Sequence, residues 1–371
     1  MSSGAVFANV CDMDRMAIAR VVSLVIGAML AWSLIGSAEA DDYFKGKTIR
    51  IVVGTPTGGG YDGYARLVAR HLGNFIPGRP AVIISNMPGA SGTKAATYLH
   101  AIAPKDGSVI ATFNKSMPLY QALGQAGVAF KTEQMSWIGS VSQAADVVAV
   151  WHATGVRTIA DAKRREVVMG ADSGGGTMST YPALLNAMLG TKFKIVTGYA
   201  GGNAVNYAIE QGEVEGRGSS PWVSWKSTRP AWVREGWIVP LVQIGFKKDA
   251  DLPNVPLLTD LAETEEQNLM FRFVSAPISI ERPFAGPPEM AREPLGILRD
   301  AFDRMVKDEA FLGDAARQNM DVDPQRGEEV AKIVADIVAA PAAMVRKVRE
   351  IMAAKDANAR NGSKSSAEPQ E

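Results

Sequence analysis

Short β-branched runs alternate with segments of helical apolar spacing over most of the chain. Residues 49–54 form one such run, a glycine-rich turn follows, and residues 64–72 place apolar side chains at helical spacing. Further strands are predicted at 81–85 and 109–113, on either side of a helix at 93–102. Alternation of this kind is typical of a parallel sheet covered by helices.

A second unit of the same type is predicted from about residue 147 to 244. Residues 138–145 are the predicted crossing into it, and the β-type run 271–278 is the predicted return. Two crossings imply a hinge between two α/β domains. The elements expected in the second unit are strands at 147–151, 167–170, 194–197 and 239–244 and a helix at 177–189.

Length and charge agree with this organisation. A chain of 371 residues exceeds the usual size of one hydrophobic core, which favours two domains. Lys plus Arg and Asp plus Glu both number 39, so no strong basic field would attract nucleic acid. Whatever binds here is expected to bind locally.

The first forty residues resemble a secretory signal. Arg15 and Arg20 precede the apolar run 21–35, and the small-x-small site at 38–40 makes Asp41 the predicted mature N-terminus. A retained membrane anchor is the alternative, although the run is shorter than the roughly 20 residues that span a bilayer. We therefore expect a periplasmic protein.

The loop at 54–62 is the most informative segment for function. In an open α/β sheet, ligands bind beyond the carboxyl ends of the strands, where this loop lies. Its three consecutive glycines let backbone N–H groups approach an anion, and the following helix offers its positive end. Asp62 either takes part in binding or caps that helix. No Lys-Ser or Lys-Thr pair follows the glycines, which disfavours a phosphate-binding P-loop.

The segment 171–177 repeats the same device in the second unit, with three glycines between a predicted strand and a predicted helix. Two such loops suggest a small anion held in the cleft between the domains. The alternative is a coincidence of turn chemistry.

Several other chemistries have no sequence support. Cys11 is the single cysteine and precedes the predicted cleavage site, so disulfides and thiolate catalysis are excluded from the mature chain. The histidines, His71, His100 and His152, lack metal-ligand spacing, and no G-x-S-x-G elbow occurs. We expect no metal, no cofactor and no catalytic residue.

Several motifs together resemble the solute receptors of tripartite tricarboxylate transporters, also called Bug-type receptors. The resemblance spans about residues 42–351. Its marks are Tyr43-Phe44-Lys45-Gly46-Lys47-Thr48-Ile49-Arg50-Ile51-Val52-Val53 with the loop at 56–62, Asn86-Met87-Pro88-Gly89-Ala90-Ser91-Gly92, Ala103-Pro104-Lys105-Asp106-Gly107 and Leu252-Pro253-Asn254-Val255-Pro256.

The resemblance implies a type II periplasmic-binding-protein fold, with two α/β domains joined by a hinge and a ligand cleft between them. It implies domain 1 at 41–142 plus 274–355 and domain 2 at 143–273. The residues 356–371 are polar and lack apolar periodicity, which predicts a disordered tail. The ligand-binding residues that it implies are Thr57, Gly58, Gly59, Tyr61, Asp62, Asn114, Ser116, Ser173 and Thr177.

Two segments depart from the family pattern. Residues 198–202 keep Tyr199 but lack the usual Pro and Lys, and residues 215–220 place Arg217 where a hydrophobic strand is usual. Arg217 could pair with a ligand carboxylate, or with Glu213 or Glu215 at the surface. Trp222, Trp225, Trp232 and Trp237 follow, either as an aromatic wall of the site or as packing.

The predicted function is therefore a monomeric, non-enzymatic periplasmic receptor. It would capture a small organic carboxylate and deliver it to integral membrane permease subunits. A sensor that feeds a signalling partner and an exported enzyme that acts on a carboxylate are the alternatives.

Overall fold

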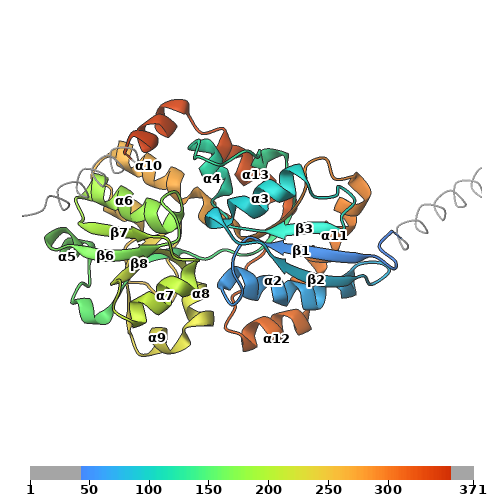
Figure 1. Ribbon diagram of the computed structural model, residues 1–371, viewed down its shortest axis with the longest axis horizontal. Coiled ribbons are helices and arrows are strands. Elements are labelled where there is room, and N and C mark those ends of the chain that lie inside the picture. Colours follow the sequence, from blue (N-terminus) through green and yellow to red (C-terminus); the bar gives the residue numbers. More distant parts are fainter. Residues whose placement is uncertain (1–42, 352–371) are drawn as a thin grey trace, which may run out of the picture.

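The computed structural model describes residues 43–351 and contains two β-sheets, each covered by helices on both faces. Figure 1 shows two lobes side by side, one around β1–β3 and the other around β6–β8. The predicted signal at 1–40 and the predicted tail at 356–371 lie outside the described residues. No described helix is long and apolar enough to cross a membrane.

The first sheet has the order β11-β4-β10-β3-β1-β2. β1 is parallel to β2 and β3, whereas β10 runs antiparallel to β3 and β4, so the sheet is mixed rather than wholly parallel. Its strands are β1 (Thr48–Val53), β2 (Ala81–Asn86), β3 (Val109–Thr112), β4 (Ser136–Ser142), β10 (Glu281–Gly286) and β11 (Gln325–Arg326).

Alternate side chains of β1 enter two separate cores. Ile49, Ile51 and Val53 pack with residues of α2 and α11, while Val52 packs with residues of α3 and α13. This is the two-sided burial expected of a central strand. The helices of this lobe are α2 (Gly60–His71), α3 (Thr93–Ala101), α4 (Met117–Ala122), α11 (Arg292–Met305), α12 (Glu309–Arg317) and α13 (Gly327–Val338).

The second sheet has the order β7-β6-β8-β5-β9, with β5 antiparallel to both of its neighbours. Its strands are β5 (Asp146–Trp151), β6 (Val167–Ala171), β7 (Phe193–Thr197), β8 (Gly216–Pro221) and β9 (Ile238–Ile244). Its helices are α5 (Ile159–Arg164), α6 (Thr177–Leu189), α7 (Gly202–Glu210), α8 (Trp222–Thr228), α9 (Pro230–Arg234) and α10 (Glu265–Ser275).

The chain passes between the sheets twice, from β4 to β5 and from α10 to β10. The prediction of a β-type run at 271–278 is wrong, because these residues lie in α10 and a following 3-10 helix. Thr264 caps α10 by accepting a hydrogen bond from the N–H of Gln267, and Phe271 and Val274 face the core at helical spacing. The exact domain boundaries stay predictions.

Candidate functional site

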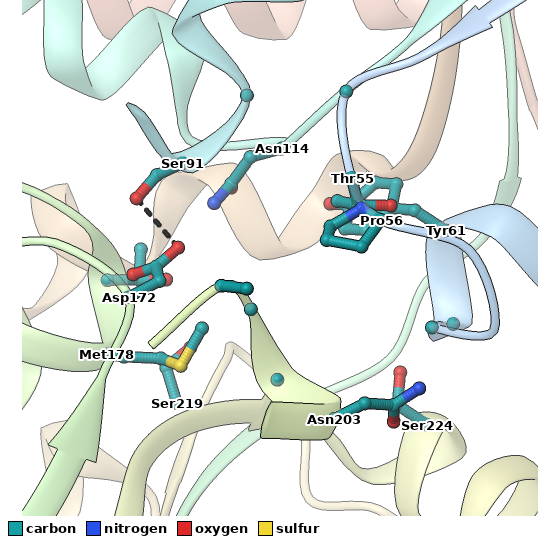
Figure 2. Close-up of a pocket in the computed structure, with 18 of the residues that line it drawn as sticks. Thr55, Pro56, Tyr61, Ser91, Asn114, Asp172, Met178, Asn203, Ser219 and Ser224 are labelled. Atoms are coloured by element: carbon teal, nitrogen blue, oxygen red, sulfur yellow. Dashed lines mark hydrogen bonds between the residues drawn. The ribbon is translucent and has the colours of Figure 1, made fainter. Parts of the chain in front are cut away.

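A cavity of about 430 Å³ lies between the two sheets, at the carboxyl ends of β1, β3 and β6 (Figure 2). The loop after β1 forms one wall, and the segments after β6 and β7 form the opposite one. Seven of the lining residues are glycines, so backbone forms part of the wall. Figure 2 shows Thr55, Pro56 and Tyr61 on one side and Asp172 and Met178 on the other.

Asp62 holds the first loop in place. Its carboxylate accepts hydrogen bonds from the N–H of Gly58, from Arg66 and from Asn86, each at 2.9 Å. Burial alone would raise the pKa of Asp62, but these hydrogen bonds bring it below its usual value. Asp62 is buried and does not line the cavity, so it anchors the loop from behind.

Each glycine-rich loop contacts a different segment across the cleft. Asn203, at the start of α7, donates a hydrogen bond to the carbonyl oxygen of Gly58 at 2.8 Å. Ser91 donates to Asp172 at 2.8 Å, as Figure 2 shows, and its hydroxyl lies 2.7 Å from that of Ser173. Both loops therefore border one cleft, and these hydrogen bonds join each loop to a segment other than the opposite glycine-rich loop.

Two further hydrogen bonds hold the loop after β6 against the first lobe. Gln125 donates to the carbonyl oxygen of Gly175 at 2.8 Å, and the N–H of Thr177 donates to the hydroxyl of Tyr120 at 3.0 Å. These hydrogen bonds hold the two lobes in contact around the cavity.

A buried cluster of charges forms the floor of the cavity. Lys115 donates to Asp146 at 2.6 Å and also pairs with Glu281, which in turn pairs with Arg282. Ser219 donates to the second oxygen of Asp146 at 2.6 Å. With two cations and two carboxylates, the cluster is balanced in charge.

Arg282 joins this cluster to both walls of the cleft. Its guanidinium lies 4.3 Å from the ring centre of Tyr61 and donates to the hydroxyl of Ser224 at 2.6 Å. A Cβ at Gly60 would lie 2.5 Å from that hydroxyl and 2.7 Å from the guanidinium, so this approach requires glycine. The backbone of Arg282 itself has a φ of +61°, a strained value for a residue other than glycine.

Arg217 lines the cavity from β8 without a carboxylate partner. Among residues 43–351, no carboxylate oxygen lies within 4.0 Å of its guanidinium, and its hydrogen bond to Asn206 is long, at 3.4 Å. The guanidinium lies 5.6 Å from the ring centre of Trp225 and against the backbone of Gly202. Burial lowers the pKa of Arg217 to about 10, which leaves it charged at neutral pH.

The two carboxylates predicted as alternative partners of Arg217 interact with other residues instead. Glu215 forms an ion pair with Arg165 at 2.6 Å, and Glu213 accepts a hydrogen bond from Tyr199 at 3.3 Å. Neither carboxylate neutralises Arg217. Its charge is therefore directed at the cavity rather than at a surface ion pair.

The predicted site residues divide into two groups. Those that line the cavity are Thr57, Gly59, Tyr61, Asn114, Thr177, Tyr199 and Arg217. Those outside the lining are Gly58, Asp62, Ser116 and Ser173. Ser116 is fully buried beside α4, and Ser173 accepts a hydrogen bond from the N–H of Gly176.

The four tryptophans of the segment 222–237 pack in the second lobe instead of forming an aromatic wall, since none of the four is among the residues that line the cavity. Trp222, Trp225 and Trp232 are buried in one core cluster, whereas Trp237 is 41% exposed. Trp225 stacks on Trp232 at 5.7 Å between ring centres. Their effect on the site is indirect, through support of Arg217.

Sequence reasoning missed several lining residues. Lys115 and Asp172 adjoin predicted site residues, so proximity in sequence could have found them. Ser91 lies in a quoted motif but had no assigned role. Arg282 and Asp146 flank the two crossings between the sheets, and no local pattern marks them.

The described histidines do not form a metal site, and residues 43–351 contain no group of three or more His, Cys, Asp or Glu that could hold a metal ion. His71 lies 3.0 Å from Asp314, His100 lies 3.3 Å from Gln134, and His152 stacks on Trp237. Each has an ordinary structural contact, and none of the three lines the cavity.

The sequence matches no protein-family model and no curated protein significantly. Among solved structures it is similar to MatC from Rhodopseudomonas palustris with bound malate, at 16% identity and a TM-score of 0.64, over 83% of this chain and 100% of that one. It is also similar to Rpa4515 from R. palustris with adipate, at 17% identity and a TM-score of 0.64, over 83% and 98%.

A TctC solute-binding protein from Polaromonas, without ligand, matches at 18% identity and a TM-score of 0.55, over 83% of this chain and 98% of that one. This chain has the fold of periplasmic solute-binding proteins. The predicted α/β fold of this class is thereby confirmed, and the match extends over almost the whole length of each solved chain. At these identities the likeness concerns the fold, and the ligand has to be argued from the cavity.

Proposed function

We propose that this protein is a periplasmic receptor that captures a small organic carboxylate and delivers it to permease subunits of the tripartite tricarboxylate type. The observation that carries the proposal is Arg217, a cation in the wall of an interlobe cavity that has no carboxylate partner within residues 43–351. A guanidinium in a cavity wall is suited to bidentate pairing with a carboxylate.

The remaining walls suit a small anion. The helices α2, α6 and α7 begin at the cavity, so their N-terminal ends add positive potential there. A volume of about 430 Å³ fits a metabolite and excludes a polymer. Bound malate and bound adipate in structures of this fold are compatible with such a ligand.

Binding without turnover is the mode that the site favours. The buried carboxylates Asp146 and Glu281 are both engaged by cations, and Asp172 accepts two hydrogen bonds, which makes all three poor general bases. We infer a receptor that releases its ligand unchanged. Export through the signal at 1–40 and cleavage before Asp41 belong to the same proposal.

Thermal unfolding with a panel of mono- and dicarboxylates tests the proposal. A ligand at a hundredfold excess over its Kd should stabilise the mature chain by about 2.7 kcal/mol. Arg217→Ala should weaken binding by about 1.5–3 kcal/mol, since it removes a charged hydrogen bond.

Arg229→Ala is the matched control. Arg229 lies 5.5 Å from the ring centre of Trp232, much as Arg217 lies over Trp225, but it does not line the cavity. Its removal should change affinity much less than Arg217→Ala does, because its charge acts on Arg217 only from a distance. If amines or neutral sugars shift the melting temperature and no carboxylate does, the proposed ligand class is wrong.

The permease partner requires its own test. Immobilised mature protein should retain the integral subunits from detergent-solubilised membranes of the source cell, and more strongly with ligand than without it. Retention of a signalling receptor in their place would favour the sensor alternative.

A further inference from the structure

The charges around the cavity constrain the ligand beyond its carboxylate. Three cations line the cavity, Lys115, Arg217 and Arg282, together with the carboxylates of Asp146 and Asp172. Lys115 pairs with Asp146 and with Glu281, and Glu281 also pairs with Arg282. This set neutralises itself, because it contains two cations and two anions.

One charge of each sign is left over, Arg217 on β8 and Asp172 just after β6. The two strands are parallel neighbours, with Gly170 paired to Arg217, so the two side chains project near the same end of the sheet. Among the described residues, neither has an ion-pair partner within 4.0 Å, although the charge of Asp172 acts on Arg217 over a longer distance. Both are partly exposed and line the cavity.

Asp172 retains capacity to accept hydrogen bonds. One of its oxygens accepts from the hydroxyl of Ser91 and the other from the N–H of Ser173, both at 2.8 Å. An ionised carboxylate offers about four acceptor positions, so about two remain. A ligand cation can therefore bind Asp172 without displacing either bond.

We propose that the ligand carries an ammonium group as well as a carboxylate, and that Asp172 binds this ammonium while Arg217 binds the carboxylate. The receptor would thus take an amino acid in preference to the dicarboxylate of the same carbon skeleton. A simple dicarboxylate brings two negative charges to a wall with one free cation and one free carboxylate, and like charges close together in a cavity are unfavourable. This inference rests on the proposed function.

Asp172 has a competing structural role, because its bond to Ser91 joins the two lobes. A variant of Asp172 could weaken every ligand merely by loosening the closed form. Matched ligands and a matched variant separate the two roles. The ligand pairs are succinate with aspartate, glutarate with glutamate, and adipate with 2-aminoadipate.

Calorimetric titration of the dialysed mature protein with each pair is the test. In the wild type, the amino member of the best-binding pair should bind at least tenfold more tightly than its partner. Asp172→Asn, which is nearly isosteric, should abolish this preference by weakening the amino member alone. Ser91→Ala, which removes the interlobe bond but keeps the carboxylate, should change both members by the same factor and preserve the preference.

Two results would overturn the inference and leave the proposed function standing. In one, the dicarboxylate binds as tightly as the amino acid. In the other, Asp172→Asn weakens both members equally, as Ser91→Ala does. If no member of any pair binds while an uncharged or purely cationic solute does, the proposed function falls as well.

Discussion

At the scale of single residues, Asp62 and Arg217 show what sequence patterns can predict about a binding site and what they cannot. Both were predicted site residues beside glycines or small residues, yet Asp62 supports the loop from behind and Arg217 lines the cavity. The sequence could place both residues beside glycine-rich segments but could not predict the direction of either side chain. That direction depends on partners far away in sequence, such as Asn86 for Asp62 and Gly202 for Arg217.

Replacement of Asp62 should therefore affect stability. Asp62→Ala leaves the N–H of Gly58 and one side-chain N–H of Asn86 without their acceptor, which should cost about 1–3 kcal/mol of unfolding free energy. Arg66→Ala removes only a half-exposed ion-pair partner and should cost at most about 1 kcal/mol. Urea unfolding of both variants is the measurement, and equal losses would contradict the anchoring role.

The same contacts predict a pH dependence. The pKa of Asp62 is lowered in the folded state, so its contribution is complete above the unfolded-state value of about 3.9 and is lost as pH falls through the folded value. The stability difference between wild type and Asp62→Ala should shrink on acidification below about pH 4. A difference that stays constant to pH 2.5 would show that the ionised carboxylate is not what the loop requires.

At the scale of elements, hydrophobic patterns located most strands but missed β8. Its sequence is dominated by small and polar residues, so neither apolar alternation nor β propensity marks it. The strand is central nonetheless, between β5 and β6, because Gly216 and Gly218 let neighbouring elements approach closely. Hydrophobic patterns also failed to predict β10, because this strand contains a proline and follows a helix.

Gly218 tests this account of β8. A Cβ there would collide with the carbonyl oxygen of Met178 and the ring of Pro182, both in α6. Gly218→Ala should destabilise the fold by about 1–3 kcal/mol through overpacking. Gly174→Ala is the control, because a Cβ there meets nothing within 4 Å, and it should be near neutral. Thermal unfolding of the two variants should separate them, and a neutral Gly218→Ala would contradict the close packing of β8 on α6.

At the scale of the whole molecule, alternating strands and helices with two glycine-rich loops were sufficient to predict two α/β units with a cleft between them. The charged floor was not predictable, because it is assembled from the ends of β3, β5 and β10, which are distant in sequence. The central claim concerns what this assembled cavity holds.

Selection from a mixture tests that claim most directly. Dialysed mature protein would be incubated with equal amounts of carboxylates, amino acids, amines and neutral sugars, and the complex isolated by gel filtration. Mass spectrometry of the released ligand should find a carboxylate of unchanged mass, about one per chain, and little of it with Arg217→Ala. Recovery of only solutes without a carboxylate, or of a chemically altered product, would contradict the account.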